Sequence, residues 1–378
     1  MTGGGATEPS RSEPGRAATT WTDPVGVGVI GHGFMGKTHI QCYLSAQASG
    51  FPCEVYGIAA TSPIVLLDDG AGGNIARREG RRGLDLSRVR LHDNYRALLD
   101  DPAIELVSAC TPTPSHMQIA RDALLAGKRV LVEKPVALSS REIGVLAGED
   151  SLGLVMPAMC VRYWPGWVEL REAVARGALA KGAVARGEAA RGEKTGVGQR
   201  LRSLHLHRVG ERPGWSPFYA DNRQCGGALF DLHLHDTDFV YHCLGAPSEV
   251  ESTGHEDDIT TRYRFADLPD VNVTARGAWV RGEPFQMRFE AVFEGGGRMT
   301  YDISRQPAFT TEGIGAGARI TYSTGYDGEV IAALGSCRGT PYPISLHEAA
   351  AVARVIEAER ESLGSGRAVP IPSGAAQP

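Results

Sequence analysis

The sequence contains few cysteines and aromatic residues, and it has no long apolar run. The seven cysteines among 378 residues stand singly, without the CxxC spacing of a zinc or redox site, and indicate free thiols in a reducing compartment. No apolar run approaches the roughly 20 residues of a membrane span. The first twenty residues lack the apolar segment of a signal peptide and are expected to form a disordered tail. These absences predict a cytoplasmic location and no membrane partner.

An excess of positive charge is also absent. Lys and Arg number 39 while Asp and Glu number 44, which gives a formal net charge of -5 and argues against a nucleic-acid partner. One stretch, from Arg176 to Arg212, is locally basic, with nine basic and three acidic residues. We interpret it as a solvated or substrate-covering loop. Its basic residues are Arg176, Lys181, Arg186, Arg191, Lys194, Arg200, Arg202, Arg208 and Arg212.

Glycine, in contrast, is abundant, with 48 of 378 residues, and its position near the start of the chain is informative. An apolar segment from Val25 to Ile30 is followed by Gly31-His32-Gly33-Phe34-Met35-Gly36 and then by a helix-compatible stretch from Lys37 to Ala48. The order of strand, GxGxxG and helix is typical of a dinucleotide site. The glycines permit the turn and the approach of a pyrophosphate, and the helix N-terminus offers free N–H groups to phosphate.

The pattern that follows predicts a first domain over residues 24–154, after a tail at 1–23. Apolar strand-like runs at 54–60, 104–110 and 129–132 alternate with helical stretches. Such alternation predicts an α/β fold with a doubly wound parallel sheet, which is a Rossmann domain.

The pattern changes after about Leu154, and we predict a second α+β domain over residues 155–372. A helix is expected over 165–175 and another near 227–244. Alternating runs at 259–265, 271–280, 285–293 and 298–303 with short connections indicate a mostly antiparallel open sheet. Ser345 and Glu348 form a capping-box signal for a last amphipathic helix.

Two predicted strand ends of the first domain carry polar residues. In a doubly wound sheet, ligands lie beyond the carboxyl ends of the strands. Thr111-Pro112-Thr113-Pro114-Ser115-His116 follows one such end, and Glu133-Lys134-Pro135 follows the next. A lysine before proline is held in an extended conformation, so Lys134 is expected to point into the cleft, where it can donate to a substrate hydroxyl.

A third signal follows the double glycine Gly226-Gly227. On a helix, Asp231, His235 and Asp238 stand at i, i+4 and i+7 and share one face. His233 lies on nearly the opposite side from His235, so the two rings cannot share a metal ion, and no metal is expected. A histidine flanked by carboxylates is expected to have a pKa near neutrality or above, which suits a general acid or base.

These motifs together resemble the Gfo/Idh/MocA family of oxidoreductases, named for glucose-fructose oxidoreductase and inositol dehydrogenase. The resemblance rests on the four motifs in order and extends from about Val25 to the last helix. It implies that Lys134, Asp231 and His235 are catalytic and that Arg162, in Arg162-Tyr163-x-Pro165, lies near the substrate. It also implies a homo-oligomer, a dimer or tetramer, formed through the open sheet.

The implied activity is hydride transfer between a nicotinamide cofactor and a carbinol carbon of a sugar, inositol or related polyol. His235 would remove the hydroxyl proton, Lys134 would stabilise the oxygen, and Asp231 would orient the pair. We expect the cofactor to contact Gly31, Gly33, Phe34, Met35, Gly36, Thr61, Ser62, Thr111, Pro112, His116, Glu133 and Lys134. Trp215 is expected to stack on the substrate together with Phe218 and Tyr219, although core packing explains these aromatic residues equally well.

The choice between NAD and NADP is not decided by a standard signature. NAD sites usually carry an acidic residue about 20 residues after the glycines. The corresponding strand end reads Ile58-Ala59-Ala60-Thr61-Ser62, with neither that acid nor an arginine for a 2′-phosphate directly after it. Arginines at 77, 78, 81 and 82 follow later, in a stretch typical of solvated loops. The family habit favours NAD slightly.

Two alternative functions share these motifs. In a redox-assisted glycosidase or lyase, tightly bound NAD would oxidise a sugar carbon transiently and be regenerated. In a nonenzymatic sugar sensor, the cofactor site would remain without catalysis. The presence of Lys134, Asp231 and His235 together argues against the sensor, while only the reaction products separate the first alternative from a dehydrogenase.

Overall fold

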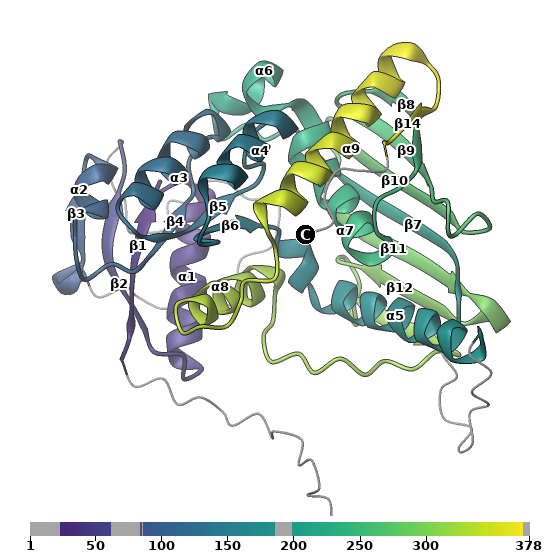
Figure 1. Cartoon of the computed structure of the whole chain (residues 1–378), viewed down its shortest axis with the longest axis horizontal. Helices are drawn as coiled ribbons and strands as arrows, with labels where there is room; N and C mark the ends of the chain where they lie inside the picture. Colours follow the sequence, from purple (N-terminus) through teal and green to yellow (C-terminus); the bar gives the residue numbers. More distant parts are fainter. Residues whose placement is uncertain (1–22, 62–83, 85, 186–198, 373–378) are drawn as a thin grey trace, which may run out of the picture.

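The computed structural model describes residues 23–61, 84, 86–185 and 199–372, with only the backbone described over 178–185. The chain forms two sheets, each covered by helices (Figure 1). The predicted N-terminal tail lies almost wholly outside the described residues. No helix within these ranges is long and apolar enough to cross a membrane.

The first sheet contains six parallel strands in the order β3-β2-β1-β4-β5-β6. This order is that of a doubly wound Rossmann sheet, as the sequence predicts. Every residue of β1 is buried, because helices cover both faces of the sheet. The strands are β1 Val25–Ile30, β2 Cys53–Ala59, β3 Arg90–His92, β4 Leu106–Ala109, β5 Arg129–Glu133 and β6 Val155–Ala158.

Helices cover both faces of this sheet, and one of them comes from the far end of the chain. Helix α8 packs against α1, with Val330 and Leu334 in the same apolar cluster as Val25 and Ile40. The chain therefore returns to its first domain after building the second. The helices are α1 Phe34–Ala48, α2 Tyr95–Leu99, α3 His116–Leu125, α4 Ser140–Glu149 and α8 Gly325–Ser336, with short 3-10 turns at Leu86–Arg88 and Thr113–Ser115.

The predicted domain boundary at 154 differs from the structure. Strand β6 pairs with β5 in parallel and completes the first sheet, so the first sheet extends to Ala158. The strand is short and contains Pro157, which weakens its sequence signal. The return of α8 further shows that a single cut in the sequence does not separate the two domains.

The second sheet contains eight strands in the order β13-β12-β11-β7-β10-β9-β8-β14. It is antiparallel except for the pair β7 and β10, which confirms the prediction of a mostly antiparallel open sheet. The strands are β7 Leu201–Gly210, β8 Glu249–His255, β9 Asp258–Arg264, β10 Asn272–Trp279, β11 Gln286–Phe293, β12 Arg298–Asp302, β13 Phe309–Glu312 and β14 Val369–Pro370.

Three helices cover one face of this sheet, α5 Pro165–Ala185, α7 Leu234–Leu244 and α9 Leu346–Ser365 (Figure 1). Trp167 of α5, Phe239 of α7 and Val355 of α9 share one apolar cluster with the inward side chains of the strands. Helix α9 also packs on α4 of the first domain, so it joins the two halves. Burial alternates along β9, as expected for a sheet with one covered face.

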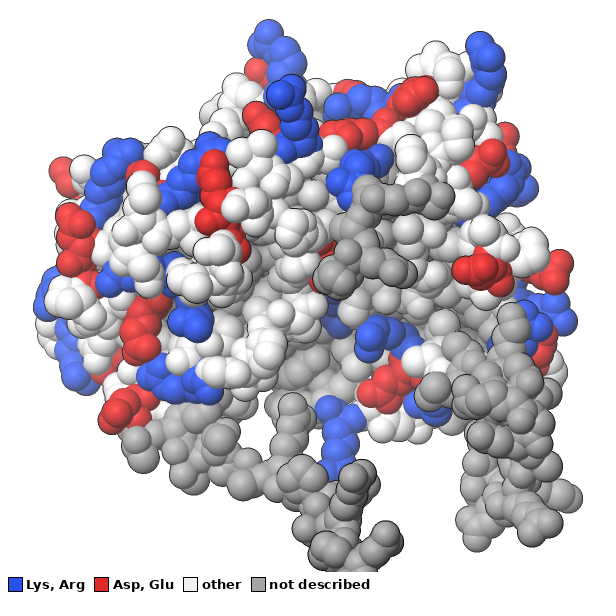
Figure 2. Space-filling model, viewed as in Figure 1, with Lys and Arg blue, Asp and Glu red and all other residues white. Residues whose placement is uncertain are grey.

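The other face of the sheet carries polar side chains that pair with each other. Arg276 of β10 binds Asp258 of β9 at 2.9 Å, and Arg288 of β11 binds Asp302 of β12 at 3.2 Å. Elsewhere on the molecule, positive and negative side chains are interspersed over the face seen in Figure 2. This view therefore shows no broad basic surface of the kind that binds nucleic acid.

Strand β7 corrects the interpretation of residues 176–212 as one solvated loop. Residues 201–210 form a central strand, whose inward positions include Leu204, Leu206 and Arg208. The many basic residues hid the alternation of buried and exposed positions in this segment. Residues 186–198 of the same stretch lie outside the described residues.

Gly277 allows the helical segment Leu229–His233 to lie directly on the sheet. A Cβ atom at this position of β10 would lie 2.5 Å from Cβ and 2.8 Å from Cα of His233. His233 ends a short π-helix, Leu229–His233, that runs into α7. A side chain at position 277 would therefore push this segment away from the strands.

We predict that Gly277→Ala lowers the free energy of unfolding by about 1–3 kcal/mol, because overpacking a tight backbone contact forces a shift. Chemical denaturation followed by tryptophan fluorescence measures the change. The control is Gly144→Ala on the exposed side of α4, where an added Cβ meets no described atom within 4 Å. This control should gain about 0.5–1 kcal/mol, and equal changes in both variants would contradict the packing argument.

Candidate active site

The glycine turn after β1 is fixed by backbone contacts. Gly31 has a φ of 93°, and a Cβ atom on it would lie 2.3 Å from the carbonyl oxygen of Cys110. A Cβ atom on Gly36 would lie 1.9 Å from the carbonyl oxygen of Gly31. An added Cβ at Gly33 meets nothing within 4 Å in the described part of the chain. The first and third glycines are thus required by the turn, whereas the second faces open space.

Helix α1 begins directly after this open position. Gly33 is its N-cap and supplies no side-chain cap, and the first turn contains no acidic residue. The first N–H groups and the positive end of the helix dipole therefore remain suited to an anion. Gly33, Phe34 and Met35 are placed where the pyrophosphate of a dinucleotide would approach.

His116 braces the two loops that follow β4 and β5. Its ring nitrogens lie 2.8 Å from the carbonyl oxygen of Pro135 and 2.7 Å from that of Thr111. The side chain is 1% exposed, so its position favours a structural role over the predicted direct contact with cofactor. Ser115 donates to the hydroxyl of Thr111 at 2.7 Å, which further orders the turn around Pro112.

Two predicted cofactor residues follow β2 in the sequence. Thr61 is exposed and lies two residues after Ala59, the last residue of this strand. Ser62 and the arginines at 77, 78, 81 and 82 lie outside the described residues.

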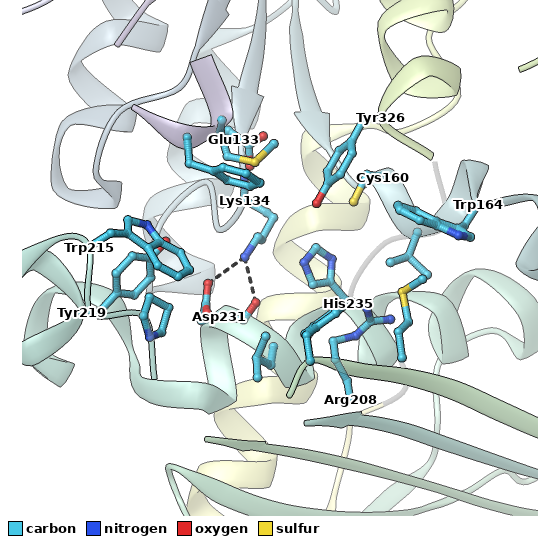
Figure 3. Close-up of a pocket in the computed structure, with 17 residues that line it drawn as sticks. Glu133, Lys134, Cys160, Trp164, Arg208, Trp215, Tyr219, Asp231, His235 and Tyr326 are labelled. Carbon is cyan, nitrogen blue, oxygen red and sulfur yellow. Dashed lines mark hydrogen bonds and ion pairs between the residues drawn. The ribbon is translucent and has the colours of Figure 1, made fainter. Parts of the chain in front are cut away.

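One pocket lies between the two domains and contains all three predicted catalytic residues (Figure 3). Both domains contribute polar groups to it, and aromatic side chains form much of its wall. Its lining comprises Phe34, Met35, Glu133, Lys134, Cys160, Val161, Trp164, Arg208, Pro213, Trp215, Tyr219, Asp231, Leu232, His235, Phe285, Met287 and Tyr326.

Lys134 and Asp231 join the domains across this pocket. The Lys134 Nζ donates to Asp231 Oδ1 at 3.0 Å and to the Asp231 backbone oxygen at 2.8 Å (Figure 3). The two side chains are 15% and 14% exposed. An ammonium group has three hydrogens, so one remains for a substrate oxygen. The ion pair therefore links the two domains and holds the Lys134 ammonium in position as a hydrogen-bond donor.

His235 lies beside this pair, but its environment differs from the prediction. Desolvation, followed by the charges of Lys134 and Arg208, lowers the pKa of His235 well below its usual value. The prediction of a pKa near neutrality or above is wrong, because cations rather than carboxylates act on the ring. A neutral imidazole at physiological pH is still a competent proton acceptor.

Asp238 does not flank His235, because it binds Arg162. The Arg162 Nε lies 2.9 Å from Asp238 Oδ2, and the Nη2 lies 2.7 Å from Oδ1. The Arg162 Nη1 donates to Glu348 of α9 at 3.1 Å. Arg162 is 6% exposed and its guanidinium is held among these carboxylates, so the structure does not place it as a substrate contact. The expectation that Arg162 lies near the substrate is therefore corrected. Arg162 is a buried residue of the turn before α5, and it links this turn to α7 and to α9.

His233 and His235 diverge, as the sequence spacing predicts. The His233 Nε2 lies 3.3 Å from Glu359 Oε2 and 3.2 Å from the Tyr263 hydroxyl, in the core between α9 and the sheet. His235 lines the pocket. The two rings therefore do not share a ligand.

A different buried cluster has the residue types of a metal site. Ligand atoms of His39, Glu133 and Glu329 lie within 4.8 Å of one another in the described structure. The His39 Nε2 lies 3.1 Å from Glu133 Oε1 and 3.7 Å from Glu329 Oε1. Burial and the nearby Glu133 raise the pKa of Glu329, which favours the protonated, uncharged form of this side chain. The absence of a metal stays a prediction.

Glu133 also supports the neighbouring lysine. Its Oε2 accepts a hydrogen bond from the Lys134 backbone N–H at 3.1 Å. The His39 ring is held in turn by Ser108, whose Oγ lies 3.0 Å from Nδ1. Glu133 is thus fixed at the end of β5 and lines the pocket.

Trp215 forms part of an aromatic wall at the open side of the pocket. Its ring centroid lies 6.3 Å from that of Phe34 and 5.9 Å from that of Tyr219, and the residue is 39% exposed. Phe218 packs on Tyr219 behind this wall, with centroids 5.0 Å apart. Trp215 is therefore placed to contact a bound ring.

Sequence reasoning missed Arg208 and its partner Asp236. Arg208 of β7 is 2% exposed and its Nη2 lies 2.8 Å from Asp236 Oδ1, yet the residue lines the pocket. The period-two alternation of Leu204, Leu206 and Arg208 is the signal that could have placed it inside. Asp236 lies between His235 and Asp238 in the sequence, and the helical spacing gave no reason to single it out.

The first domain is similar to a known protein family. Residues 25–147 match the model of an oxidoreductase family with an NAD-binding Rossmann fold, Gfo/Idh/MocA. The first domain of the chain thus matches this family. The match ends within the first domain, so the fold of the second rests on the structure and on its likeness to solved structures.

Curated relatives of the chain include several dehydrogenases. Inositol 2-dehydrogenase 2 of Saccharopolyspora erythraea is 28% identical over 66% of this chain and 60% of its own length. Levoglucosan dehydrogenase of Pseudarthrobacter phenanthrenivorans is 34% identical, over 31% of this chain and 27% of its own. An uncharacterised oxidoreductase of Bacillus subtilis, YrbE, is 23% identical over 76% of this chain and 69% of its own.

Solved structures show the same two-domain fold. A levoglucosan dehydrogenase in complex with NADH has a TM-score of 0.66 at 21% identity, covering 93% of this chain and all of that one. A myo-inositol dehydrogenase from Corynebacterium glutamicum has a TM-score of 0.65 at 17% identity, with 93% and 100% coverage. These likenesses confirm the predicted fold class.

The buried pair of Arg162 and Asp238 yields a stability prediction. Asp238→Asn should lower the free energy of unfolding by about 3 kcal/mol, because it leaves the Arg162 charge buried with less compensation. Chemical denaturation measures the loss. Asp267→Asn, on an exposed turn after β9, is the matched control and should change stability by less than about 0.5 kcal/mol. Similar losses of unfolding free energy in both variants would contradict the claim that burial of the Arg162–Asp238 pair causes the loss.

Proposed function

We propose that this protein is a nicotinamide-dependent dehydrogenase that oxidises a secondary alcohol carbon of a neutral cyclic sugar or polyol. The observation that carries the proposal is the meeting of Lys134, Asp231 and His235 in the interdomain pocket that Phe34 and Met35, at the start of α1, also line. A proton acceptor, a fixed cationic donor and a phosphate-binding turn are the parts that alcohol oxidation requires.

The three side chains have separate roles in this proposal. Bound nicotinamide supplies the hydride acceptor. His235 is neutral and accepts the proton of the substrate hydroxyl, while Lys134 donates a hydrogen bond to the same oxygen and stabilises its developing negative charge. Asp231 holds the Lys134 ammonium at 3.0 Å and so fixes the direction of the remaining N–H bond.

The cofactor is proposed to be NAD rather than NADP. The family model describes an NAD-binding fold, and a structural neighbour binds NADH. After β2, Thr61 carries a hydroxyl that can bind a ribose. Positions 60 and 61 are Ala and Thr, so neither carries a positive charge that would attract a 2′-phosphate. The ratio of kcat/KM for NAD+ to that for NADP+ tests the choice, and a ratio above one is expected.

A cyclic sugar or polyol is supported by the relatives and by the pocket. The relatives named above act on inositol and levoglucosan, and others are named for trans-1,2-dihydrobenzene-1,2-diol. The aromatic wall of Phe34, Trp215 and Tyr219 suits the apolar face of a ring, and the polar floor suits its hydroxyls. We accordingly propose myo-inositol and levoglucosan as the first substrates to assay.

The cellular setting belongs to the same proposal. All seven cysteines are free, which fits a reducing cytoplasm. The uncovered face of the second sheet is proposed to form a homo-oligomer interface, and its paired charges make that interface a polar one.

We predict that His235→Ala lowers kcat by roughly 10²- to 10⁴-fold, the usual loss when a general base is removed. The assay follows absorbance of the reduced nicotinamide with the substrate that the wild type oxidises. His205→Ala, on the uncovered face of the second sheet, is the matched control and should retain kcat within about twofold. An unchanged kcat in His235→Ala would remove this residue from the role of base.

The lowered pKa of His235 predicts the acid side of the pH profile. A histidine with an ordinary pKa of about 6.5 would lose half of its basic form at that pH. Because desolvation, Lys134 and Arg208 keep His235 neutral, kcat/KM should stay constant as the pH falls through 6.5 and should decline only at lower pH. A midpoint between about pH 6.5 and 7.5 would contradict this assignment.

A further inference from the structure

Arg208 lies on β7 of the second sheet, and its guanidinium is a positively charged hydrogen-bond donor at the wall of the pocket. It follows Leu204 and Leu206 on the inward face of β7, and it is the first charged residue of that row. Its Nε and Nη2 bind Asp236 of α7 at 3.3 and 2.8 Å. The guanidinium carbon lies 5.9 Å from the ring centroid of Trp167, which supports it from the other side.

The second terminal nitrogen of Arg208 takes no part in this pairing. Nη1 has no hydrogen-bond acceptor among the described residues, although Arg208 is 2% exposed and lines the pocket. A guanidinium remains charged at any physiological pH and can only donate. Nη1 is therefore available to a hydrogen-bond acceptor bound in the pocket.

The position of Arg208 relative to the catalytic residues indicates which acceptor it meets. Figure 3 shows the His235 ring between the Lys134 amine and the Arg208 guanidinium, and both charges act on its pKa. In the proposed function, Lys134 and His235 bind the oxygen that is oxidised. Arg208 then lies on the opposite side of His235, where the oxygen of a neighbouring carbon would be placed.

The charges of the site favour a neutral oxygen over a carboxylate. Asp236 neutralises Arg208, and Asp231 neutralises Lys134, while His235 is uncharged. The pocket therefore has no uncompensated cation to attract an anion. A hydroxyl oxygen accepts a hydrogen bond from Nη1 without bringing further charge into the site.

The pair of Arg208 and Asp236 is not explained by stability alone. Replacing a buried ion pair with apolar residues of similar volume is often neutral or stabilising. Its neighbours on the same face, Leu204 and Leu206, show that apolar residues fit this layer. The contact with the pocket gives the pair a use that an apolar pair would lack.

We infer that Arg208 is a specificity-determining residue that binds a hydroxyl vicinal to the oxidised carbinol, so that the enzyme selects neutral ring substrates with a 1,2-diol. This inference rests on the proposed dehydrogenase function. Asp236 acts as a positioning residue, because it holds the guanidinium without contacting the substrate.

The test compares three small probes with NAD+ in the wild type and in variants. The probes are trans-cyclohexane-1,2-diol, cyclohexanol and trans-2-hydroxycyclohexane-1-carboxylate. The main variant is R208M/D236N, which removes both charges together and so avoids an unpaired buried carboxylate. R208M alone is the second variant, and R121M, at a surface ion pair on α3 away from the pocket, is the matched control. Thermal unfolding verifies that each variant is folded.

The inference predicts that kcat/KM of the wild type is about 10- to 100-fold higher for the diol than for cyclohexanol, the size of one hydrogen bond to a charged group. R208M/D236N should lose this preference by lowering kcat/KM for the diol alone, while R121M keeps it. If a larger polyol is oxidised and the small probes are not, the same comparison uses that polyol and its analogue deoxygenated at the neighbouring carbon.

Two outcomes would overturn the inference while leaving the proposed function intact. One is an equal loss for the diol and cyclohexanol in R208M/D236N, or no loss in either. The other is a preference of the wild type for the carboxylate probe, which would make Arg208 an anion site. Failure of the wild type to reduce NAD+ or NADP+ with these probes, myo-inositol or levoglucosan would instead overturn the proposed function, and this inference with it.

Discussion

The ion pair between Lys134 and Asp231 is the interaction on which the site depends. Lys134 stands at the end of β5 in the first domain, and Asp231 lies in the π-helix that leads into α7 of the second. The pair closes the pocket across the domain interface and places the lysine beside His235. Because each residue belongs to a different domain, the chemistry exists only when the two domains are packed as observed.

Two further carboxylates in α7 also form ion pairs with buried cations. Asp231, Asp236 and Asp238 hold Lys134, Arg208 and Arg162 respectively. Every cation in this set is thereby compensated, which limits the cost of burying it. His235 lies among them without a carboxylate of its own and stays neutral. The acids of the motif therefore bind cations around His235 instead of raising its pKa.

The sequence predicted the fold class and the meeting of Lys134, Asp231 and His235 in the pocket, because the signals were local. The GxGxxG turn, the lysine before Pro135 and the spacing of Asp231 and His235 each depend on a few neighbouring residues. The pKa of His235, the burial of Arg162 and the place of Arg208 depend on residues far along the chain, such as Glu348 and Asp236. The boundary at 154 failed for the same reason, since β6 is defined by its pairing with β5 and not by its own four residues.

The central claim is that this site moves a hydride from a ring carbinol to nicotinamide. Incubation of the protein with NAD+ and myo-inositol or levoglucosan deuterated at the ring carbons, followed by mass spectrometry of the cofactor, tests it directly. The account predicts reduced nicotinamide that carries one deuterium, together with an equal amount of ketone. Failure to bind either nicotinamide cofactor, or reduced cofactor without deuterium, would contradict it.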